Sequence, residues 1–308
     1  MDKSDTIALK AFAILFVLLG HTNYLDSSGA WGVHIFLFLS GYGLEISYQK
    51  NGLTDFWTKR FRKVFIPYEA VVLVVLPIEM LVNKQCGFLN VIVSMIGLDL
   101  GYNIDPSMWY ISYCFLLYVE FYLWKRFEKK ATNVVQYMML LAFIVFNFLL
   151  SIMEKFGFAT VWSSAAQVWV YTIDFYVGLA FARKGNYSKK IQYISGFIAL
   201  IYFIVRYGKI HYKADLILFS LSAAFITLLL SMKLKIGKCK GIQKLGGISL
   251  WIYLLEGHLL RWKGYLFGSS NSNILNMLVI LLSLLIGYIA YQINSVLQNK
   301  VRLKNLCR

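Results

Sequence analysis

Residues 7–25 read IALKAFAILFVLLGHTNYL and form an apolar run that is long enough to cross the hydrocarbon core of a bilayer as one helix. Similar runs recur to the end of the 308-residue chain, of which 59% is hydrophobic and only 15% is charged. Soluble domains do not have this composition. The sequence therefore predicts an all-α protein whose helices cross a membrane many times.

Apolar runs bounded by charged residues predict a polytopic transmembrane bundle of about ten spans, in a single membrane domain that comprises residues 1–308. The predicted spans are residues 7–25, 31–48, 64–82, 108–124, 134–153, 160–182, 191–207, 216–232, 248–262 and 274–293. The run at residues 86–98 is short, which favours an interfacial or re-entrant helix. A cleaved signal peptide is the alternative for the first run, but Lys10 and His21 would interrupt its apolar region.

The distribution of basic residues sets the predicted orientation. The formal net charge is +16, and most Lys and Arg residues lie in alternate connections between the predicted spans. Because basic residues collect on the cytoplasmic side, we expect both termini to be cytoplasmic in a multi-pass protein of the cell membrane. This placement explains the charge without a nucleic-acid partner. The four cysteines are too scattered for a disulfide framework or a CxxC metal site, so we expect no metal.

Ionisable residues within a membrane span are costly and are therefore functional candidates. Those in the predicted spans are Lys10, His21, His34, Glu69, Glu120, Asp174, Glu256 and His258. Helix packing is the alternative for any single one of them. Lys10 and His21 form a pair, because eleven residues place them only about 20° apart around a helix and about 16.5 Å apart along it. A donor whose anionic end stays at the inner surface could reach along this stripe towards His21, whose imidazole can accept a proton near neutral pH.

This spacing resembles the acyltransferase-3 family of membrane proteins, which O-acylate sugars and other extracytoplasmic acceptors with acyl-CoA. LKAFAILFVLLGH, residues 9–21, has ten residues between Lys10 and His21, where the family has Arg and His. GVHIFLFLSGYGLE, residues 32–45, resembles the family's next helix, which ends in Ser-Gly-Tyr, here Ser40, Gly41 and Tyr42.

A third motif of the family is a basic Arg-x-x-Arg run that leads into a proline. In FWTKRFRKVFIPY, residues 56–68, Arg60 and Lys63 stand at these places before Pro67. Weaker likeness continues through MWYIS at 108–112, FYVGLAFAR at 175–183 and LGGISLWIYLLEGHLL at 245–260. Three residues depart from the pattern: Lys10 and Lys63 replace arginines, and Glu256 stands where many members have a histidine. Lysine lacks the bidentate fork of arginine, so we expect altered affinity for phosphate.

The resemblance implies acyl transfer from acyl-CoA, most simply acetyl-CoA as a co-substrate, to a hydroxyl of a sugar or cell-envelope polysaccharide. It assigns His21 as the catalytic base and Lys10, Arg60 and Lys63 to the CoA phosphates. The residues expected to support the substrate are Ser40, Tyr42, Trp109 and Glu256. An acyl-histidine relay is an alternative to direct transfer. The sequence contains no GxSxG motif, so it does not support a serine-esterase mechanism.

The same residues also suit roles outside acyl transfer. The basic run is typical of positive-inside anchoring or of contact with anionic lipid. Ser40 and its neighbouring glycines are typical of close helix packing. Trp109 and Tyr110 suit an aromatic belt at the membrane surface as well as an acceptor groove. Buried charges such as Asp174 and Glu256 also suit a transporter or flippase, the rival function, and a non-catalytic scaffold is a third possibility.

Overall fold

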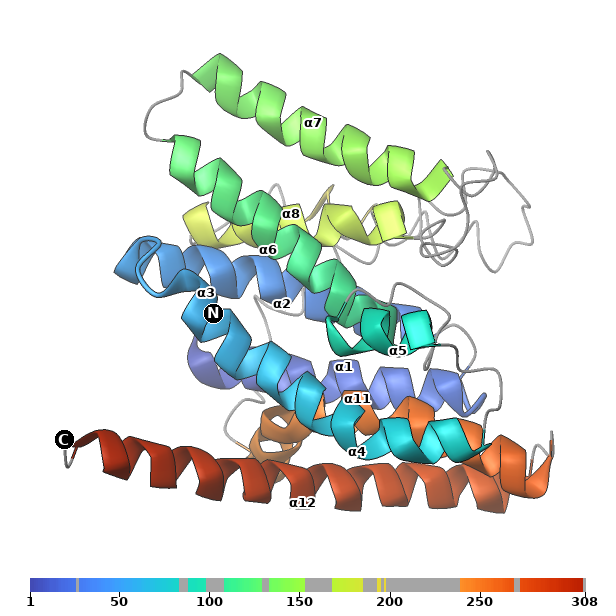
Figure 1. Cartoon of the computed structure of the whole chain (residues 1–308). Coiled ribbons are helices and arrows are strands. Elements are labelled where there is room, and N and C mark those ends of the chain that lie inside the picture. The colour runs from blue at the N-terminus through green and yellow to red at the C-terminus, as the bar shows by residue number, and fades with distance from the viewer. Residues whose placement is uncertain are drawn as a thin grey trace.

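The computed structural model describes residues 1–25, 28–82, 88–97, 108–128, 133–152, 168–184, 193–194, 197, 239–268 and 272–306. All the regular structure in these ranges is helical, which confirms the all-α prediction. The elements are α1 (Lys3–His21), α2 (Ser28–Asn51), α3 (Phe56–Arg60), the π-helix η1 (Phe61–Phe65), α4 (Ile66–Val82), α5 (Phe88–Met95), α6 (Trp109–Glu128), α7 (Asn133–Ile152), α8 (Val168–Lys184), α11 (Lys240–Phe267) and α12 (Asn273–Leu306). Figure 1 shows the long helices lying side by side.

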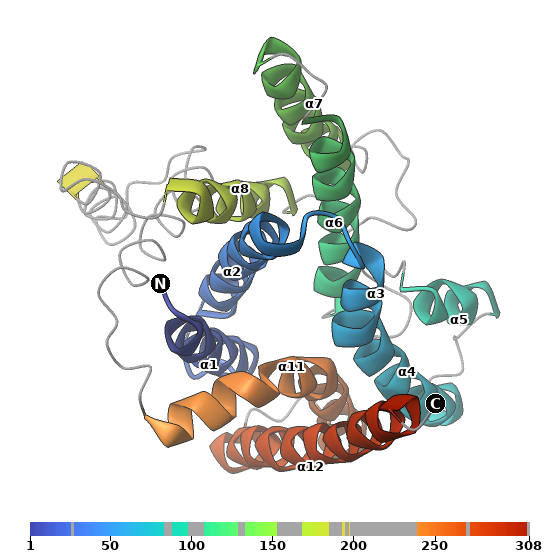
Figure 2. The same ribbon diagram turned by 90° about the vertical axis from the view of Figure 1, so that its left-hand side faces the viewer.

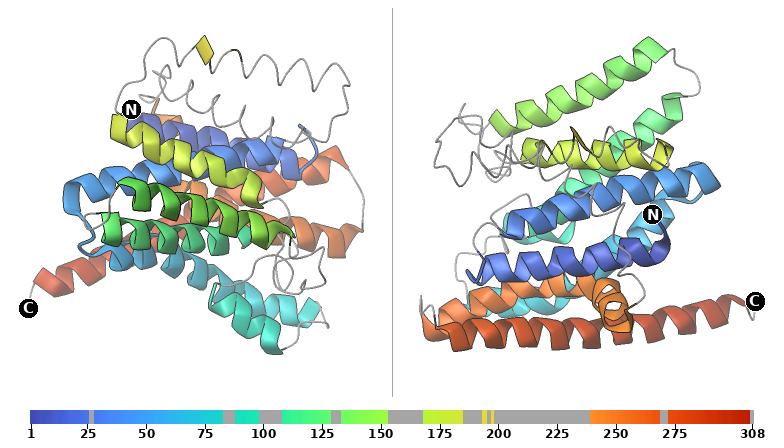
Figure 3. Two further views of the ribbon diagram at one scale, coloured as in Figure 1. Left: turned by 90° about the horizontal axis from the view of Figure 1, so that it is seen from above. Right: turned by 180° about the vertical axis from the view of Figure 1, so that it is seen from behind.

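Three of the described helical stretches are long and apolar enough to cross a membrane, namely Lys3–His21, Phe56–Leu81 and Asn273–Leu297. The other predicted spans in the described ranges coincide with α2, α6, α7, α8 and α11, and the short run at 86–98 contains α5. The predicted spans at 191–207 and 216–232 fall almost entirely outside the described residues. The start of α1 and the end of α12 lie at the same end of the bundle (Figure 3). The count of ten and the cytoplasmic termini remain predictions.

Helix α1 has defined ends, which fix the positions of the residues on its stripe. At its start, the backbone N–H of Asp5 donates to the Asp2 carboxylate at 2.8 Å and the backbone N–H of Asp2 donates to the Asp5 carboxylate at 3.0 Å, a capping box. The bond from Asp5 lowers the pKa of Asp2. At the other end, the Thr22 hydroxyl donates to the Leu18 carbonyl at 2.7 Å. Lys10 therefore lies in the middle part of α1, and His21 is the last residue of the helix.

Glycines bring the backbones of α2 and α11 into contact with α1. A Cβ atom on Gly32 of α2 would lie only 2.4 Å from the carbonyl oxygen of Ala13, and one on Gly246 of α11 only 1.9 Å from that of Ile7. Side chains are excluded at both crossings, so the helices pack at their closest approach. Helix α1 is thus held between α2 and α11, while α8 covers the other side of α2 (Figure 2).

Candidate active site

A cavity of about 330 Å³ lies among α1, α2, α3, η1, α6 and α11. Figure 2 shows these elements as a ring around the bundle axis, with α7, α8 and α12 outside it. Four residues that the sequence assigned to the site line this cavity, namely Lys10, Ser40, Arg60 and Lys63. They come from separate segments of the first 63 residues, so the fold brings the three sequence motifs to one place.

The cavity has a cationic region that its lining does not neutralise. Lys10, Arg60 and Lys63 supply three positive groups, and no carboxylate is among the residues that line the cavity in the described part of the chain. The Nε and Nη2 atoms of Arg60 are buried and have no hydrogen-bond partner among the described residues. The guanidinium carbon of Arg60 lies over two aromatic rings, 5.3 Å from the ring centroid of Phe56 and 5.8 Å from that of Tyr118. The two buried nitrogens of Arg60 lack an acceptor among the described residues, and an anion in the cavity would supply one.

The local backbone explains how the basic run reaches the cavity. Arg60 ends α3, and the next five residues form the π-helix η1, which carries Lys63 and Val64 into the lining. A π-turn is wider than an α-turn and is frequent at functional sites. The basic run therefore presents two of its cations to the interior, in contrast to a run that serves only to anchor the chain at a lipid surface.

Neutral polar groups and apolar side chains line the rest of the cavity. Helix α6 contributes Tyr110, Cys114 and Tyr118, whose spacing of four residues places them on one face. The Tyr110 and Ser40 hydroxyls lie 3.3 Å apart, and α11 adds Ser249 and Tyr253. Cys114 is a buried free thiol. The sequence offered Tyr110, together with Trp109, for an aromatic belt or an acceptor groove, but it did not point to Cys114, Tyr118, Ser249 or Tyr253. The four-residue period on α6 is a signal that could have identified the three members on that helix.

His21 pairs with Glu256 at the far end of α1. Its Nδ1 atom lies 2.7 Å from Oε1 of Glu256, whose side chain is fully buried, while the His21 side chain is 39% exposed. A Cβ atom on Gly29 would lie 3.7 Å from Nε2 of His21, so the other edge of the ring faces the α2 backbone. When Nδ1–H donates to the carboxylate, the lone pair of the imidazole lies on Nε2. An accessible imidazole oriented by a buried acid is the arrangement of a general base.

The cavity and this pair lie in line along the bundle. Lys10 is about 16.5 Å from His21 along α1, measured by helical rise. At the other end of the cavity, Tyr253 precedes Glu256 by three residues, or about 4.5 Å along α11. His21 and Glu256 are not themselves part of the lining. The cationic region is therefore remote from the pair, whereas the aromatic end of the cavity approaches it.

Two other residues expected at the site lie elsewhere. The Tyr42 hydroxyl donates to the Met1 carbonyl at 2.8 Å, and its ring packs 5.8 Å from that of Phe181. Because Tyr42 follows Ser40 by two residues, it points about 200° away from it around the helix. Trp109 does not line the cavity, but its neighbour Tyr110 does. The ring centroids of the two residues lie 6.3 Å apart.

Four other ionisable residues of the predicted spans, His34, Glu120, Asp174 and His258, make contacts between helices. His34 of α2 pairs with Asp174 of α8, and both side chains are fully buried. Tyr176 donates to Glu120 at 3.1 Å. His258 lies with its Nδ1 atom 3.4 Å from Glu79, which also accepts bonds from Arg261 and Trp262. These contacts agree with a helix-packing role for isolated buried charges.

The described helices thus hold a cationic cavity and a histidine paired with a buried carboxylate, in a chain with three helices long and apolar enough to cross a membrane. The comparison with known families gives the class of this protein. The sequence model of the acyltransferase-3 family, described as an acyltransferase domain, matches residues 6–292, and the chain therefore belongs to this family of membrane acyltransferases. No curated protein and no solved structure matches the chain at a significant level.

Proposed function

We propose that the protein transfers an acetyl group from cytoplasmic acetyl-CoA to a hydroxyl of an extracytoplasmic sugar or cell-envelope polysaccharide. The observation that carries the proposal is the uncompensated cation cluster of Lys10, Arg60 and Lys63, in a cavity whose other end approaches His21 and Glu256. An acyltransferase needs a site for its donor and a base for its acceptor, and these two regions supply them.

The polarity of the cavity supports CoA as the donor. CoA carries several phosphate charges at one end, a neutral arm with two amides in the middle and the thioester at the other end. Lys10, Arg60 and Lys63 suit the phosphates, because charge-assisted bonds to phosphate oxygens are the stronger kind. The hydroxyls of Ser40 and Ser249 suit the amides. The order of these groups directs the thioester towards the end of the cavity near His21.

The chemistry follows from the His21–Glu256 pair. Nε2 of His21 removes the proton of the acceptor hydroxyl as its oxygen attacks the thioester carbonyl. The tetrahedral intermediate collapses with cleavage of the carbon–sulfur bond, and the imidazolium returns the proton to the CoA thiolate. The products are the O-acetyl ester and free CoA. Glu256, 2.7 Å from Nδ1, orients the ring and stabilises the imidazolium.

The test is a reaction of the purified full-length protein with acetyl-CoA labelled in its acetyl group and with glycans from a deletion strain. We expect free thiol to be released and the glycan to gain one labelled acetyl group per modified hydroxyl, as detected by mass spectrometry. Release of no thiol and no gain in mass, with correctly folded protein, would refute the proposal. Uptake of an unmodified solute by proteoliposomes, without thioester consumption, would indicate the rival transporter.

A further inference from the structure

We infer that the rings of Phe36, Tyr110 and Tyr253 form an aromatic constriction between the cation cluster and the His21–Glu256 pair, and that Tyr110 limits the donor to short acyl chains. The inference rests on the proposed function and adds a determinant of substrate specificity to it. Phe36, Tyr110 and Tyr253 lie within segments that resemble the family, on α2, α6 and α11, but they are not among the residues assigned above to the donor phosphates or to the base.

Tyr110 is the central member of the constriction. Its ring centroid lies 6.1 Å from that of Phe36 and 5.5 Å from that of Tyr253, the second pair at an interplanar angle of 72°. All three residues line the cavity. Tyr110 is buried, and its hydroxyl lies 3.3 Å from that of Ser40, which restrains the ring. Three helices that are distant in sequence thus bring their rings together at one level.

The level of these rings follows from the neighbouring contacts. On α2, the backbone of Gly29 faces His21, and Phe36 lies seven residues further on, or about 10.5 Å along the helix. On α11, Tyr253 lies about 4.5 Å before Glu256, the partner of His21. Lys10, in contrast, lies about 16.5 Å from His21 along α1. By these levels the rings of Phe36 and Tyr253 lie closer to the base than Lys10 does, and the ring of Tyr110 packs against both of them.

The acyl group is the leading part of a donor that enters from the cationic region. To bring its thioester to His21, a donor held by Lys10 and Arg60 must pass its acyl chain beside Tyr110. The interior is close-packed, so extra methylene groups there require the rings to move from their packed positions. An acetyl group adds a single methyl beyond the carbonyl and demands the least displacement.

The experiment measures the affinity of the purified full-length protein for S-alkyl-CoA thioethers, which cannot transfer the chain. The alkyl chains run from ethyl to octyl. We expect the parent protein to bind the ethyl compound best. In Tyr110→Ala the best chain becomes several carbons longer, and each methylene accommodated there raises affinity about fourfold.

The matched control is Tyr118→Ala. Tyr118 is also a tyrosine of α6 that lines the cavity, but it lies two turns away beside the Arg60 guanidinium. Its replacement is expected to change the affinity for all chain lengths by a similar factor and to leave the preferred length unchanged. Phe36→Ala and Tyr253→Ala test the same constriction from its other two helices, and size-exclusion chromatography in detergent reports folding.

The outcomes separate the two proposals. If the parent protein binds neither acetyl-CoA nor any thioether, the donor assignment fails and the constriction fails with it. If the parent binds them and every folded variant of the constriction keeps the parental length preference, the constriction is overturned while the acyltransferase proposal stands. Should Tyr110→Ala not fold, the Phe36 and Tyr253 variants decide the question. An equal shift of length preference in Tyr118→Ala would also overturn the role of Tyr110.

Discussion

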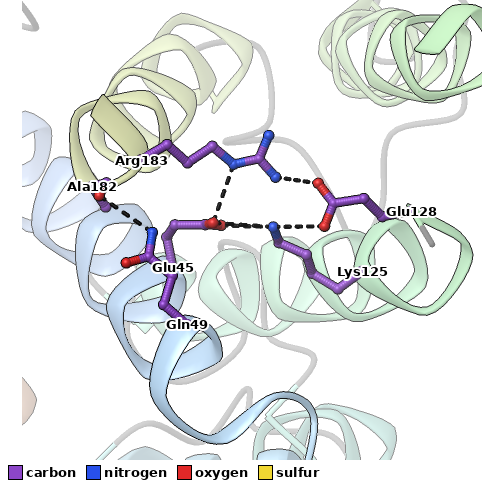
Figure 4. Close-up of polar contacts among 6 residues, drawn as sticks. All are labelled: Glu45, Gln49, Lys125, Glu128, Ala182 and Arg183. Atoms are coloured by element: carbon purple, nitrogen blue, oxygen red, sulfur yellow. Dashed lines mark hydrogen bonds and ion pairs between the residues drawn. The ribbon is translucent and has the colours of Figure 1, made fainter. Parts of the chain in front are cut away.

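Two groups of charged side chains among the described residues differ in their surroundings, because opposite charges of the protein neutralise only one of them. In the neutralised group, Nζ of Lys125 lies 2.9 Å from Glu45 and 3.0 Å from Glu128, and Arg183 pairs with both acids (Figure 4). The ring of Trp124 covers both cations, with its centroid 4.8 Å from Nζ of Lys125 and 4.5 Å from the Arg183 guanidinium. The network joins α2, α6 and α8.

The cavity shows the opposite arrangement. Lys10, Arg60 and Lys63 line it without any carboxylate among the described residues of its wall. A buried ion is tolerated when an opposite charge compensates it, and leaving one uncompensated is strongly destabilising. The first group obtains its compensation from the protein and is explained by stability. The second group has no such compensation among the described residues of the cavity wall, and the phosphates of the proposed donor would supply it.

The two histidine–carboxylate pairs differ in the same way. His34 and Asp174 are both fully buried, whereas the His21 side chain is 39% exposed beside its buried acid. Next to the first pair, a Cβ atom on Gly41 would lie 2.0 Å from the Phe175 carbonyl oxygen, so α2 and α8 leave no room for a substrate. Each pair joins a histidine Nδ1 atom to a carboxylate, and the two pairs differ in whether a substrate can reach the imidazole.

The largest expected effect separates these two pairs. We expect His21→Ala to lower acyl transfer by about 10² to 10⁴-fold with normal insertion and stability, because it removes the base. His34→Ala should instead destabilise the protein and leave the turnover per folded molecule close to that of the parent. Turnover from single-turnover assays and thermal unfolding in detergent measure the two effects. Unchanged acylation in His21→Ala would remove His21 from the mechanism.

The ease of prediction also differs between the two ends of the site. Lys10, Arg60 and Lys63 belong to consecutive segments, α1 to η1, and the family-like motifs that contain them predicted one shared site; the three residues line one cavity, while their role in donor binding stays a prediction. His21 and Glu256 are 235 residues apart, and no local pattern encodes their contact. The sequence indicated that both residues are costly in a membrane, and the packing of α11 against α1 determines that they meet.

The aromatic residues show why the remaining site was harder to predict. Motif position suggested that Tyr42 and Trp109 support the substrate. The rotation of α2 turns Tyr42 towards Phe181 instead. On α6, Tyr110 lines the cavity and the adjacent Trp109 does not. A single sequence specifies which residues share a helix face but not which helix that face meets. The helical class, in contrast, follows from composition. An apolar chain lies in lipid, where backbone N–H and C=O groups must bond to one another, and a helix achieves this within one segment.

The neutralised network gives the next prediction. Glu45→Gln removes the acid that Lys125 and Arg183 share, so we expect a loss of about 3–5 kcal/mol in the free energy of unfolding, as for a broken buried ion pair. Affinity for CoA should stay at the parental value. Glu69→Gln is the matched control, because Oε1 of Glu69 is buried without a hydrogen-bond partner among the described residues. If Glu45→Gln is no less stable than Glu69→Gln, the network does not clamp the helices.

Two arginines sharpen the contrast in ligand binding. We expect Arg60→Ala to weaken CoA binding by about 10 to 100-fold, the range for a hydrogen bond to a charged group, without lowering the thermal midpoint. Arg183→Ala should lower the midpoint and leave CoA binding unchanged, because its partners are protein acids. Titration of each purified variant with CoA at two salt concentrations measures the effect. A loss of CoA affinity in both variants would contradict the division into a ligand site and a structural network.

The smallest expected effect concerns Lys10, one of the three residues that depart from the family pattern. Lys10→Arg keeps the positive charge and adds a bidentate fork, so CoA should bind up to about threefold more tightly. Lys10→Ala removes the charge from the cavity and should weaken binding about tenfold. Both variants are titrated with CoA beside the parent protein. If the two bind CoA as the parent does, the charge at this position does not serve the donor, and the cation cluster is reduced to Arg60 and Lys63.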